Sequence, residues 1–426
     1  RGQAFHSLKS EIGFGFAMAM TQVLAEFMIS GFGVILPSIA AELRSGSSIS
    51  PMWPTSILSL VLSALVLPFA RLSDIYGGYP FFMVGLLFLI AFTGAAGFTT
   101  TEAQLDVFRA MQGIAIAAFE PASFSLIGNA YKPGRRRNIF FGIYGACAPL
   151  GFYLGILVGG VALHYAHWGW YFWTASLLAA ITAIAAYLSV PYAAWSERHE
   201  DLKMDWSGSI TLAAGLIMVA YALAAASHTA GGWANPVILA PFLVGLALFV
   251  LAIVLEAKVV TCPLLPGEFF RPKGIKPMVV ACLFFFGCFG VFLFYSTFYM
   301  QQVMNASPLQ TVLYFTPMAV GGLIISVVSG SIIHIVPAMW LLLFSGLAWI
   351  LAPLFIAVAP NTNYFPLVFL SMIFGTLGSD LTYLIFTLFC TDIQPVRYQG
   401  LAGALCSVVV NVSIAFSLCL GDMVQS

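Results

Sequence analysis

The most informative feature of this sequence is how little charge it carries. Only 8% of its 426 residues are charged, whereas a soluble domain has about 25%. The remaining charges balance to a net charge of zero, so no basic surface indicates nucleic acid as a partner. Hydrophobic residues make up 61% of the chain, and the mean hydropathy is +0.98. This composition excludes a soluble fold and indicates a protein that crosses a membrane many times.

Several kinds of chemistry lack the residues that they need. The seven cysteines are scattered without a C-x-x-C pair, which is typical of small buried hydrophobic residues and not of a disulfide or metal framework. No Gly-Lys dipeptide occurs, so the chain has no phosphate-binding loop of an ATP-driven pump. No nucleophile–base pair and no cluster of metal ligands stands out. We therefore expect no enzyme activity, no metal and no cofactor.

Apolar runs long enough to cross a bilayer recur along the whole chain. A span needs about 20 mostly apolar residues, and a window of that size predicts thirteen helices. They lie near residues 12–36, 52–70, 80–99, 103–129, 139–163, 171–191, 206–227, 236–256, 277–302, 309–333, 337–359, 364–389 and 400–421. With the N-terminus in the cytoplasm, every lysine and arginine except Arg44 and Arg109 falls on the cytoplasmic side. This bias is what membrane insertion imposes.

Small residues recur at every fourth position of the stretch "CAPLGFYLGILVGG". Cys147, Gly151, Gly155 and Gly159 share one face of a helix, since side chains four apart lie one above the other. Small residues let helix backbones approach closely in lipid, where no hydrophobic force drives helices together. Pro149 weakens the early turns and permits a bend. The row predicts a tightly packed pair of membrane helices.

Several stretches resemble motifs of one transporter family. "GACAPLGFYLGILVGG" resembles the helix-five motif of drug:proton antiporters in the major facilitator superfamily. "ARLSDIYGG" places Asp74 and Gly77 where this family has an aspartate and a glycine between helices two and three. "RAMQGIAIAA" is similar to the helix-four signature of the family, with Arg109, Gln112 and Gly113. The resemblance implies that these residues gate the transporter or pack its helices.

Two further stretches are similar to one branch of that family. "MDWSG" with "GGW" resembles the two-helix insert of the fourteen-span branch, and "YQGLAGALCSVVVNVS", which follows Asp380, looks like the closing region of fungal members. The resemblance implies two six-helix halves plus the insert, with the last helix missing from this sequence. The chain then divides into residues 1–191, 192–256 and 257–426. Because the first residue is Arg1 and not methionine, we expect that both ends are trimmed.

The sequence departs from the family pattern in two places. After Gly77 the family usually has two basic residues, whereas this chain has Gly78 and Tyr79. The absence of these basic residues predicts a weaker cytoplasmic contact between the two halves of the transporter. At the outer end of the sixth helix, Gly169 replaces an arginine that usually stands between two tryptophans. Either change is compatible with a divergent or weakly active member.

Three acidic residues interrupt otherwise apolar helices. Glu26 lies near the middle of the first predicted helix, Glu120 in the inner half of the fourth, and Asp380 near the middle of the twelfth. A charged carboxylate at mid-bilayer costs about 2.5–3.5 kcal/mol, so burial favours the neutral acid and makes each group a candidate proton carrier. The alternative is an acid that is buried and neutral and only binds a neighbour.

Arg109 is a further candidate for proton coupling. It lies one turn after Asp106, at a spacing that allows an ion pair. One interpretation is an anchor at the outer interface, whereas the resemblance implies a gatekeeper that couples protonation to helix movement. Glu120 is roughly 16 Å further along the same helix, too far for a direct pair with Arg109.

Aromatic residues make up 15% of the chain, and some of them are candidates for an apolar substrate cavity. The cavity candidates are Phe292, Tyr295, Tyr299 and Asn411. The resemblance implies a monomer that exports small amphipathic compounds or metabolites in exchange for protons, in the plasma membrane or alternatively the vacuolar membrane. Two other functions stay open: a facilitator or importer of a small polar solute, and a sensor on a transporter fold that does not transport.

Overall fold

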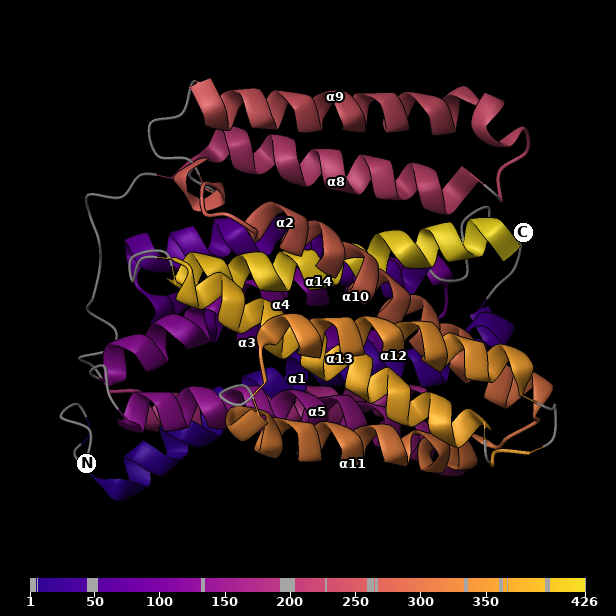
Figure 1. The fold of residues 1–426 in the computed structure, drawn as a ribbon, viewed down its shortest axis with the longest axis horizontal. Coiled ribbons are helices and arrows are strands. Elements are labelled where there is room, and N and C mark those ends of the chain that lie inside the picture. Colours follow the sequence, from indigo (N-terminus) through magenta and orange to yellow (C-terminus); the bar gives the residue numbers. More distant parts are fainter. Residues whose placement is uncertain are drawn as a thin grey trace.

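Every regular element in the described part of the chain is helical (Figure 1). The computed structural model describes residues 5, 7–43, 53–131, 135–191, 204–226, 228–258, 264, 267–332, 336–359, 363–365, 367–394 and 399–425. Among these residues, thirteen helices are long and apolar enough to cross a membrane. The predicted all-α class and the predicted count of spans are therefore confirmed.

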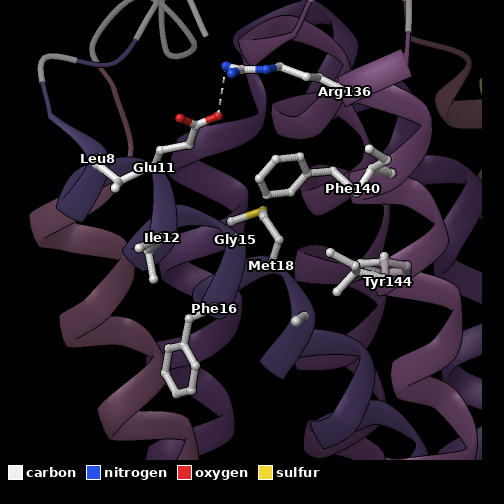
Figure 2. A pocket seen from close by; sticks show the side chains of 12 residues that line it. Leu8, Glu11, Ile12, Gly15, Phe16, Met18, Arg136, Phe140 and Tyr144 are labelled. Carbon is white, nitrogen blue, oxygen red and sulfur yellow. Dashed lines mark ion pairs between the residues drawn. The ribbon is translucent and has the colours of Figure 1, made fainter. Parts of the chain in front are cut away.

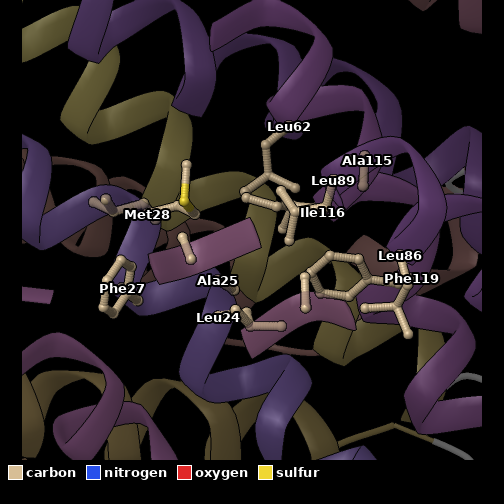
Figure 3. Close-up of a cluster of buried hydrophobic side chains, with 14 of the residues drawn as sticks. Leu24, Ala25, Phe27, Met28, Leu62, Leu86, Leu89, Ala115, Ile116 and Phe119 are labelled. Carbon is tan, nitrogen blue, oxygen red and sulfur yellow. The ribbon is translucent and has the colours of Figure 1, made fainter. Parts of the chain in front are cut away.

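The first six helices form an N-terminal bundle. They are α1 (Leu8–Leu43), α2 (Trp53–Tyr76), α3 (Gly78–Ala96), α4 (Glu102–Ala130), α5 (Arg135–Tyr165) and α6 (Gly169–Ser189). α1 packs along α5 and α6, and α4 packs against both α2 and α3. Figure 3 shows part of the shared core, which includes Leu24 and Met28 of α1, Leu62 of α2, Leu86 of α3 and Phe119 of α4. One apolar core thus holds the bundle together.

Two helices lie at one edge of the molecule (Figure 1). They are α8 (Trp206–Ala226) and α9 (Pro236–Lys258), joined through the short turn η1 (Gly232–Ala234). α8 and α9 pack along each other, and α8 also contacts α2 and α14. After the end of α8, His228 Nε2 lies 2.6 Å from Asp422 Oδ2 of α14. This helix pair is therefore fixed to the rest of the protein through α8.

The remaining helices form a C-terminal bundle. They are η2 (Gly267–Phe270), α10 (Ile275–Phe298), the π-helical turn η3 (Tyr299–Val303), α11 (Pro308–Ile332), α12 (Ala338–Val358), α13 (Leu367–Asp392) and α14 (Gln399–Gln425). α12 packs along α13, and α10 packs along α14. The two bundles meet along α5 and α11 and along α2 and α14. We call these two helix pairs the seam.

Most helix ends lie within a few residues of the predicted ones, with two larger differences. α1 continues to Leu43, although the prediction ended at residue 36, and α2 continues to Tyr76, although the prediction ended at residue 70. An apolar window stops where polar residues begin, but the backbone hydrogen bonds of a helix continue through them. α1 and α2 are accordingly longer than the hydropathy pattern indicates.

Close approaches of the backbone explain the glycines at the two departures from the family pattern. Gly77 has a φ of 93°, which favours glycine at the turn between α2 and α3. A Cβ on the next residue, Gly78, would lie only 3.1 Å from the carbonyl oxygen of Ala122. A Cβ on Gly169 would lie 2.6 Å from the carbonyl oxygen of Gly97. In this fold, a side chain at either departure would require the neighbouring backbone to move.

Candidate functional site

Three carboxylates gather where the two bundles meet. Glu26 comes from α1, Glu120 from α4 and Asp380 from α13, and each side chain is partly exposed. Glu26 lies close enough to Glu120 and Asp380 to interact with both electrostatically. The sequence scatters these groups over nearly the whole chain, and the tertiary structure brings them together. We call them the acidic cluster.

Glu26 is held within the N-terminal bundle. Gln22, one turn earlier on α1, donates from Nε2 to Glu26 Oε1 at 3.4 Å. The hydroxyl of Ser30 lies 2.9 Å from the backbone carbonyl of Glu26 and 2.7 Å from the carbonyl of Phe152 on α5. The segment of α1 that carries this acid is therefore bound directly to α5.

Glu120 is bonded across the boundary between the bundles. The hydroxyl of Ser407 on α14 donates to Oε1 at 3.3 Å, with Oε2 at 3.5 Å. Asn411, one turn further along α14, donates from Nδ2 to the backbone carbonyl of Ser407 at 3.0 Å. Asn411 Oδ1 is buried and has no hydrogen-bond partner among the described residues. Glu120 thus contributes a polar contact between the two bundles.

Asp380 lies beside the seam from within the C-terminal bundle. Its neighbour Ser379 donates a hydroxyl hydrogen bond to Oδ1 at 3.2 Å. A Cβ on Gly322 of α11 would lie 2.9 Å from Asp380 Oδ2 and 3.1 Å from Pro149 Cβ of α5. The absence of a side chain at Gly322 therefore lets this acid lie close to the α5–α11 contact.

Further contacts join the two bundles at the end opposite the one that the charge bias predicts to be cytoplasmic. The hydroxyls of Tyr153 on α5 and Thr316 on α11 are 3.0 Å apart. Gln301 of η3 donates from Nε2 to the backbone carbonyl of Val34 on α1 at 3.3 Å. On α5, the side chain of Val312 of α11 occupies the space that a Cβ on Gly160 would need. The bundles are in close contact at this end.

The glycine row packs α5 onto α1, a partner that the sequence did not identify. A Cβ on Gly151 would lie 2.5 Å from the carbonyl oxygen of Val23, and a Cβ on Gly155 would lie 2.6 Å from that of Phe27. A Cβ on Gly159 would lie 2.9 Å from the carbonyl oxygen of Gly31. The predicted tight helix pair is confirmed. Pro149 is on a different side of the helix and faces α11.

Arg109 links three helices of the N-terminal bundle. Its side chain is fully buried, and its Nε donates to the backbone carbonyl of Pro54 on α2 at 3.0 Å. Nη1 donates to the carbonyl of Met28 on α1 at 3.0 Å and to Oε1 of Gln112 at 3.2 Å. The guanidinium also lies 4.0 Å from the centre of the Phe32 ring, a favourable cation–π arrangement. Arg109 therefore ties α1 and α2 to α4.

This position corrects one interpretation of Arg109 and changes another. An anchor at the outer interface would be exposed, and Arg109 has no exposed surface. Arg109 and Asp106 interact electrostatically, but the described hydrogen bonds of the guanidinium go to the carbonyls of Pro54 and Met28 and to Gln112. Asp106 Oδ1 is buried without a hydrogen-bond partner in the described residues. The two backbone carbonyls become available only through tertiary packing, so sequence spacing alone cannot identify them as partners.

The other predicted site residues are more dispersed. Asp74 is exposed at the end of α2. Gly113 lies against α2, where a Cβ would approach the carbonyl oxygen of Leu58 to 2.7 Å. Phe292 is buried beside Trp349 in an apolar cluster that also contains Val34 of α1 and Ile156 of α5.

The two predicted tyrosines differ in their partners. The hydroxyl of Tyr299 donates to the carbonyl of Ala359 at 3.1 Å. The hydroxyl of Tyr295 is buried without a hydrogen-bond partner in the described part of the chain. It lies near Gly421 of α14, where a Cβ would be 3.5 Å from this oxygen. Among the described residues, no group of three or more histidine, cysteine, aspartate or glutamate side chains is arranged to hold a metal ion.

Two residues that contact the acidic cluster were not predicted from the sequence. Ser407 carries the hydrogen bond to Glu120, and the sequence hint was its position one turn before Asn411 on a predicted helix. Gly322 makes room for Asp380, but its neighbour Gly321 gives the same sequence signal. Only the packing of α11 against α13 distinguishes the two glycines.

Comparison with known proteins agrees with this architecture. The family profile described as Major Facilitator Superfamily matches residues 18–418. A low affinity ammonium transporter of Saccharomyces cerevisiae is 30% identical over 383 residues, which is 88% of this chain and 73% of that protein. The efflux pump terJ of Aspergillus terreus is 29% identical over 430 residues, covering 99% of this chain and 82% of the pump.

Solved structures show the same fold at lower identity. The crystal structure of the peptide transporter POT in complex with sulfate has a TM-score of 0.66 and 16% identity, covering 96% of this chain and 88% of that one. A human organic anion transporter has a TM-score of 0.65 and 14% identity, covering 97% of this chain and 94% of that one. At these identities, the similarity shows only that the fold is shared.

Proposed function

Because the chain belongs to the major facilitator superfamily, we propose that it exports small amphipathic compounds or metabolites in exchange for protons. That it is a multi-pass membrane transporter and not an enzyme follows from the family. Transport by alternating access requires the two bundles to rock about a site near the middle of the membrane. The acidic cluster lies between the bundles and is our candidate for that site.

The observation that best supports proton coupling is the hydrogen bond between Ser407 and Glu120 at 3.3 Å. It joins an acid of one bundle to a hydroxyl of the other, so the contact must break when the bundles separate on that side. Asp380 has a similar position beside Gly322 and Pro149 at the seam. A closed seam favours the neutral acid, whereas water in an open seam favours the ionised one. Rocking of the bundles then binds and releases protons.

The charge of the cluster supports cargo that is neutral or weakly cationic. Three carboxylates lie together, while the buried Arg109 is engaged by α1 and α2 within the N-terminal bundle. Ionised acids attract a cationic group, and the aromatic residues around the bundles suit an apolar body. Relatives described as an efflux pump and as the Bacillus subtilis multidrug resistance protein 3 support export of such compounds.

A facilitator or importer of a small polar cation is the second candidate. The relative described as a low affinity ammonium transporter favours it, and an acidic cluster would bind such a cation equally well. A sensor on a transporter fold would bind its ligand without moving it. Uphill movement of the solute distinguishes the three: only a coupled exporter depletes its cargo against a gradient.

Within the superfamily, we propose that the chain belongs to the fourteen-span drug:proton antiporter branch. The helix pair α8–α9, which lies between the two bundles in chain order, supports it, since that branch has a two-helix insert at this point of the sequence. We further propose a monomer in the plasma membrane, with the vacuolar membrane as the alternative. Residues 1–191 and 257–426 would form the two rocking halves, and residues 192–256 the linker and the insert.

The test is efflux from vesicles that contain the purified full chain. A panel of cationic, neutral and anionic dyes is loaded, and efflux is measured with and without an imposed pH gradient. We expect faster efflux of cationic or neutral dyes when the gradient is imposed, and loss of that acceleration in Glu120→Gln. Glu268→Gln, an exposed acid on η2, serves as the matched control. Equal efflux with and without the gradient would reject proton coupling.

A further inference from the structure

A groove lies between the first turns of α1 and α5 (Figure 2). Its volume is about 540 Å³, within the range of small-molecule sites, about 300–1,000 Å³. α1 contributes Ile12 and Phe16 to the walls, and α5 contributes Ile143. Part of the floor is Gly15, where a Cβ would lie 2.7 Å from the ring of Phe140. A larger residue there would fill the groove or displace that ring.

The walls of the groove are apolar and yet exposed. Ile12 is 63% exposed and Ile143 is 48% exposed. Ile143 belongs to a stripe along α5 that continues through Leu150 and Leu154, both also exposed. Spacings of seven and four residues place these side chains on one helix face, and exposed apolar side chains of a membrane-spanning helix contact lipid chains. The groove therefore opens toward the hydrocarbon of the bilayer.

The mouth of the groove carries a positive charge. Arg136 is 57% exposed at the side chain, and its Nη1 lies 3.6 Å from Glu11 Oε1. Glu11 is only 11% exposed at the side chain and also accepts a hydrogen bond from the hydroxyl of Tyr131 at 3.3 Å. The carboxylate is thus held inside the protein, while the guanidinium, with five N–H donors, faces outward.

We propose that this groove binds an anionic phospholipid of the cytoplasmic leaflet. One acyl chain lies in the apolar groove, and the headgroup phosphate accepts hydrogen bonds from Arg136. Basic pockets between membrane helices on the cytoplasmic side bind anionic headgroups in this way. Arginine suits the task because its planar donors match phosphate oxygens. The proposal depends on the membrane placement of α1 and α5 and not on which solute is transported.

The headgroup part is tested by native mass spectrometry of the purified full chain. The protein is equilibrated with equal amounts of phosphatidylserine and phosphatidylcholine, and retained lipid is counted. We expect one phosphatidylserine to be retained in preference. Arg136→Gln should weaken this retention about fivefold, which corresponds to about 1 kcal/mol for one cation at an anionic surface. Arg271→Gln is the matched control, because Arg271 Nη1 also lies 3.6 Å from a glutamate, Glu268, but Arg271 is not one of the residues that line this groove.

The proposed position of the lipid acyl chain is tested with two substitutions on α5. Ile143→Trp fills the groove, whereas Leu154→Trp adds the same bulk to the exposed stripe outside it. Retention should fall in the first variant and remain in the second. Equal retention of both lipids by the unmodified protein, or equal loss in Arg136→Gln and Arg271→Gln, would overturn the proposal. Displacement of the lipid by inorganic phosphate alone would also overturn it, since the site would then recognise phosphate without needing the lipid acyl chain.

Discussion

The carboxylate of Glu120 accepts a hydrogen bond from the hydroxyl of Ser407 at 3.3 Å, across the boundary between the two bundles. The residues are 287 positions apart in the chain and belong to α4 and α14. α4 belongs to the N-terminal bundle and α14 to the C-terminal bundle, so relative movement of the bundles can form or break this contact. This relationship makes Glu120 sensitive to the relative position of the bundles.

Removing the hydroxyl at position 407 tests this sensitivity. Ser407→Ala should change the rate of pH-driven efflux several-fold at normal protein abundance, because a hydrogen bond of this kind contributes about 0.5–1.5 kcal/mol to the state that contains it. Ser407→Thr keeps the hydroxyl and should retain most of the unmodified rate. Equal rates for the alanine and threonine variants would show that the hydroxyl has no role in the transport cycle.

Asp380 should be required for proton coupling. Asp380→Asn keeps the shape of the side chain and most of its hydrogen bonding, but it cannot release a proton. We expect the variant to bind substrate and to exchange it downhill, and to lose uphill efflux after a pH step in vesicles. An asparagine variant that still concentrates substrate against its gradient would assign Asp380 a structural role, and Glu26 would then be the next residue to replace.

The glycine row should be necessary for transport but not for insertion. Gly155→Leu places a side chain where Phe27 O and Ser30 Oγ lie within 2.6 Å of the Cβ position, so α5 must move away from α1. Export should be lost while membrane abundance stays normal. The matched control is Gly145→Leu on the same helix, because a Cβ at Gly145 has no neighbour within 4 Å. Similar export by both variants would contradict the role of the α1–α5 contact.

The pair of His228 and Asp422 should fix the α8–α9 hairpin to the C-terminal bundle. The two side chains are 2.6 Å apart, with exposed fractions of 23% and 7%. A double-mutant cycle with His228→Ala and Asp422→Ala, read by thermal unfolding, should give a coupling energy of about 0.5–3 kcal/mol, as expected for residues in direct contact. A coupling energy of zero would show that packing of α8 on α2 and α14 holds the hairpin without this pair.

Local patterns in the sequence are enough to predict the membrane class, the number of spans and the packing role of the glycine row. These properties follow from local rules: about 20 apolar residues cross a bilayer, and residues four apart share a helix face. Gly151, Gly155 and Gly159 therefore pointed to a close helix pair before the partner was known. The partner, α1, could not be predicted, because any apolar helix accepts a face of small residues.

Which polar groups meet depends on the tertiary structure and cannot be predicted from local patterns. Glu26, Glu120 and Asp380 come from three helices, and their approach depends on how two bundles dock. Arg109 had a nearby acid one turn away in the sequence, yet the fold gave it the backbone carbonyls of Met28 and Pro54. Carbonyl oxygens carry no side-chain signature, so no sequence pattern could identify them as partners. The physical reason is that apolar periodicity sets where helices run, while distant polar contacts depend on how those helices cross.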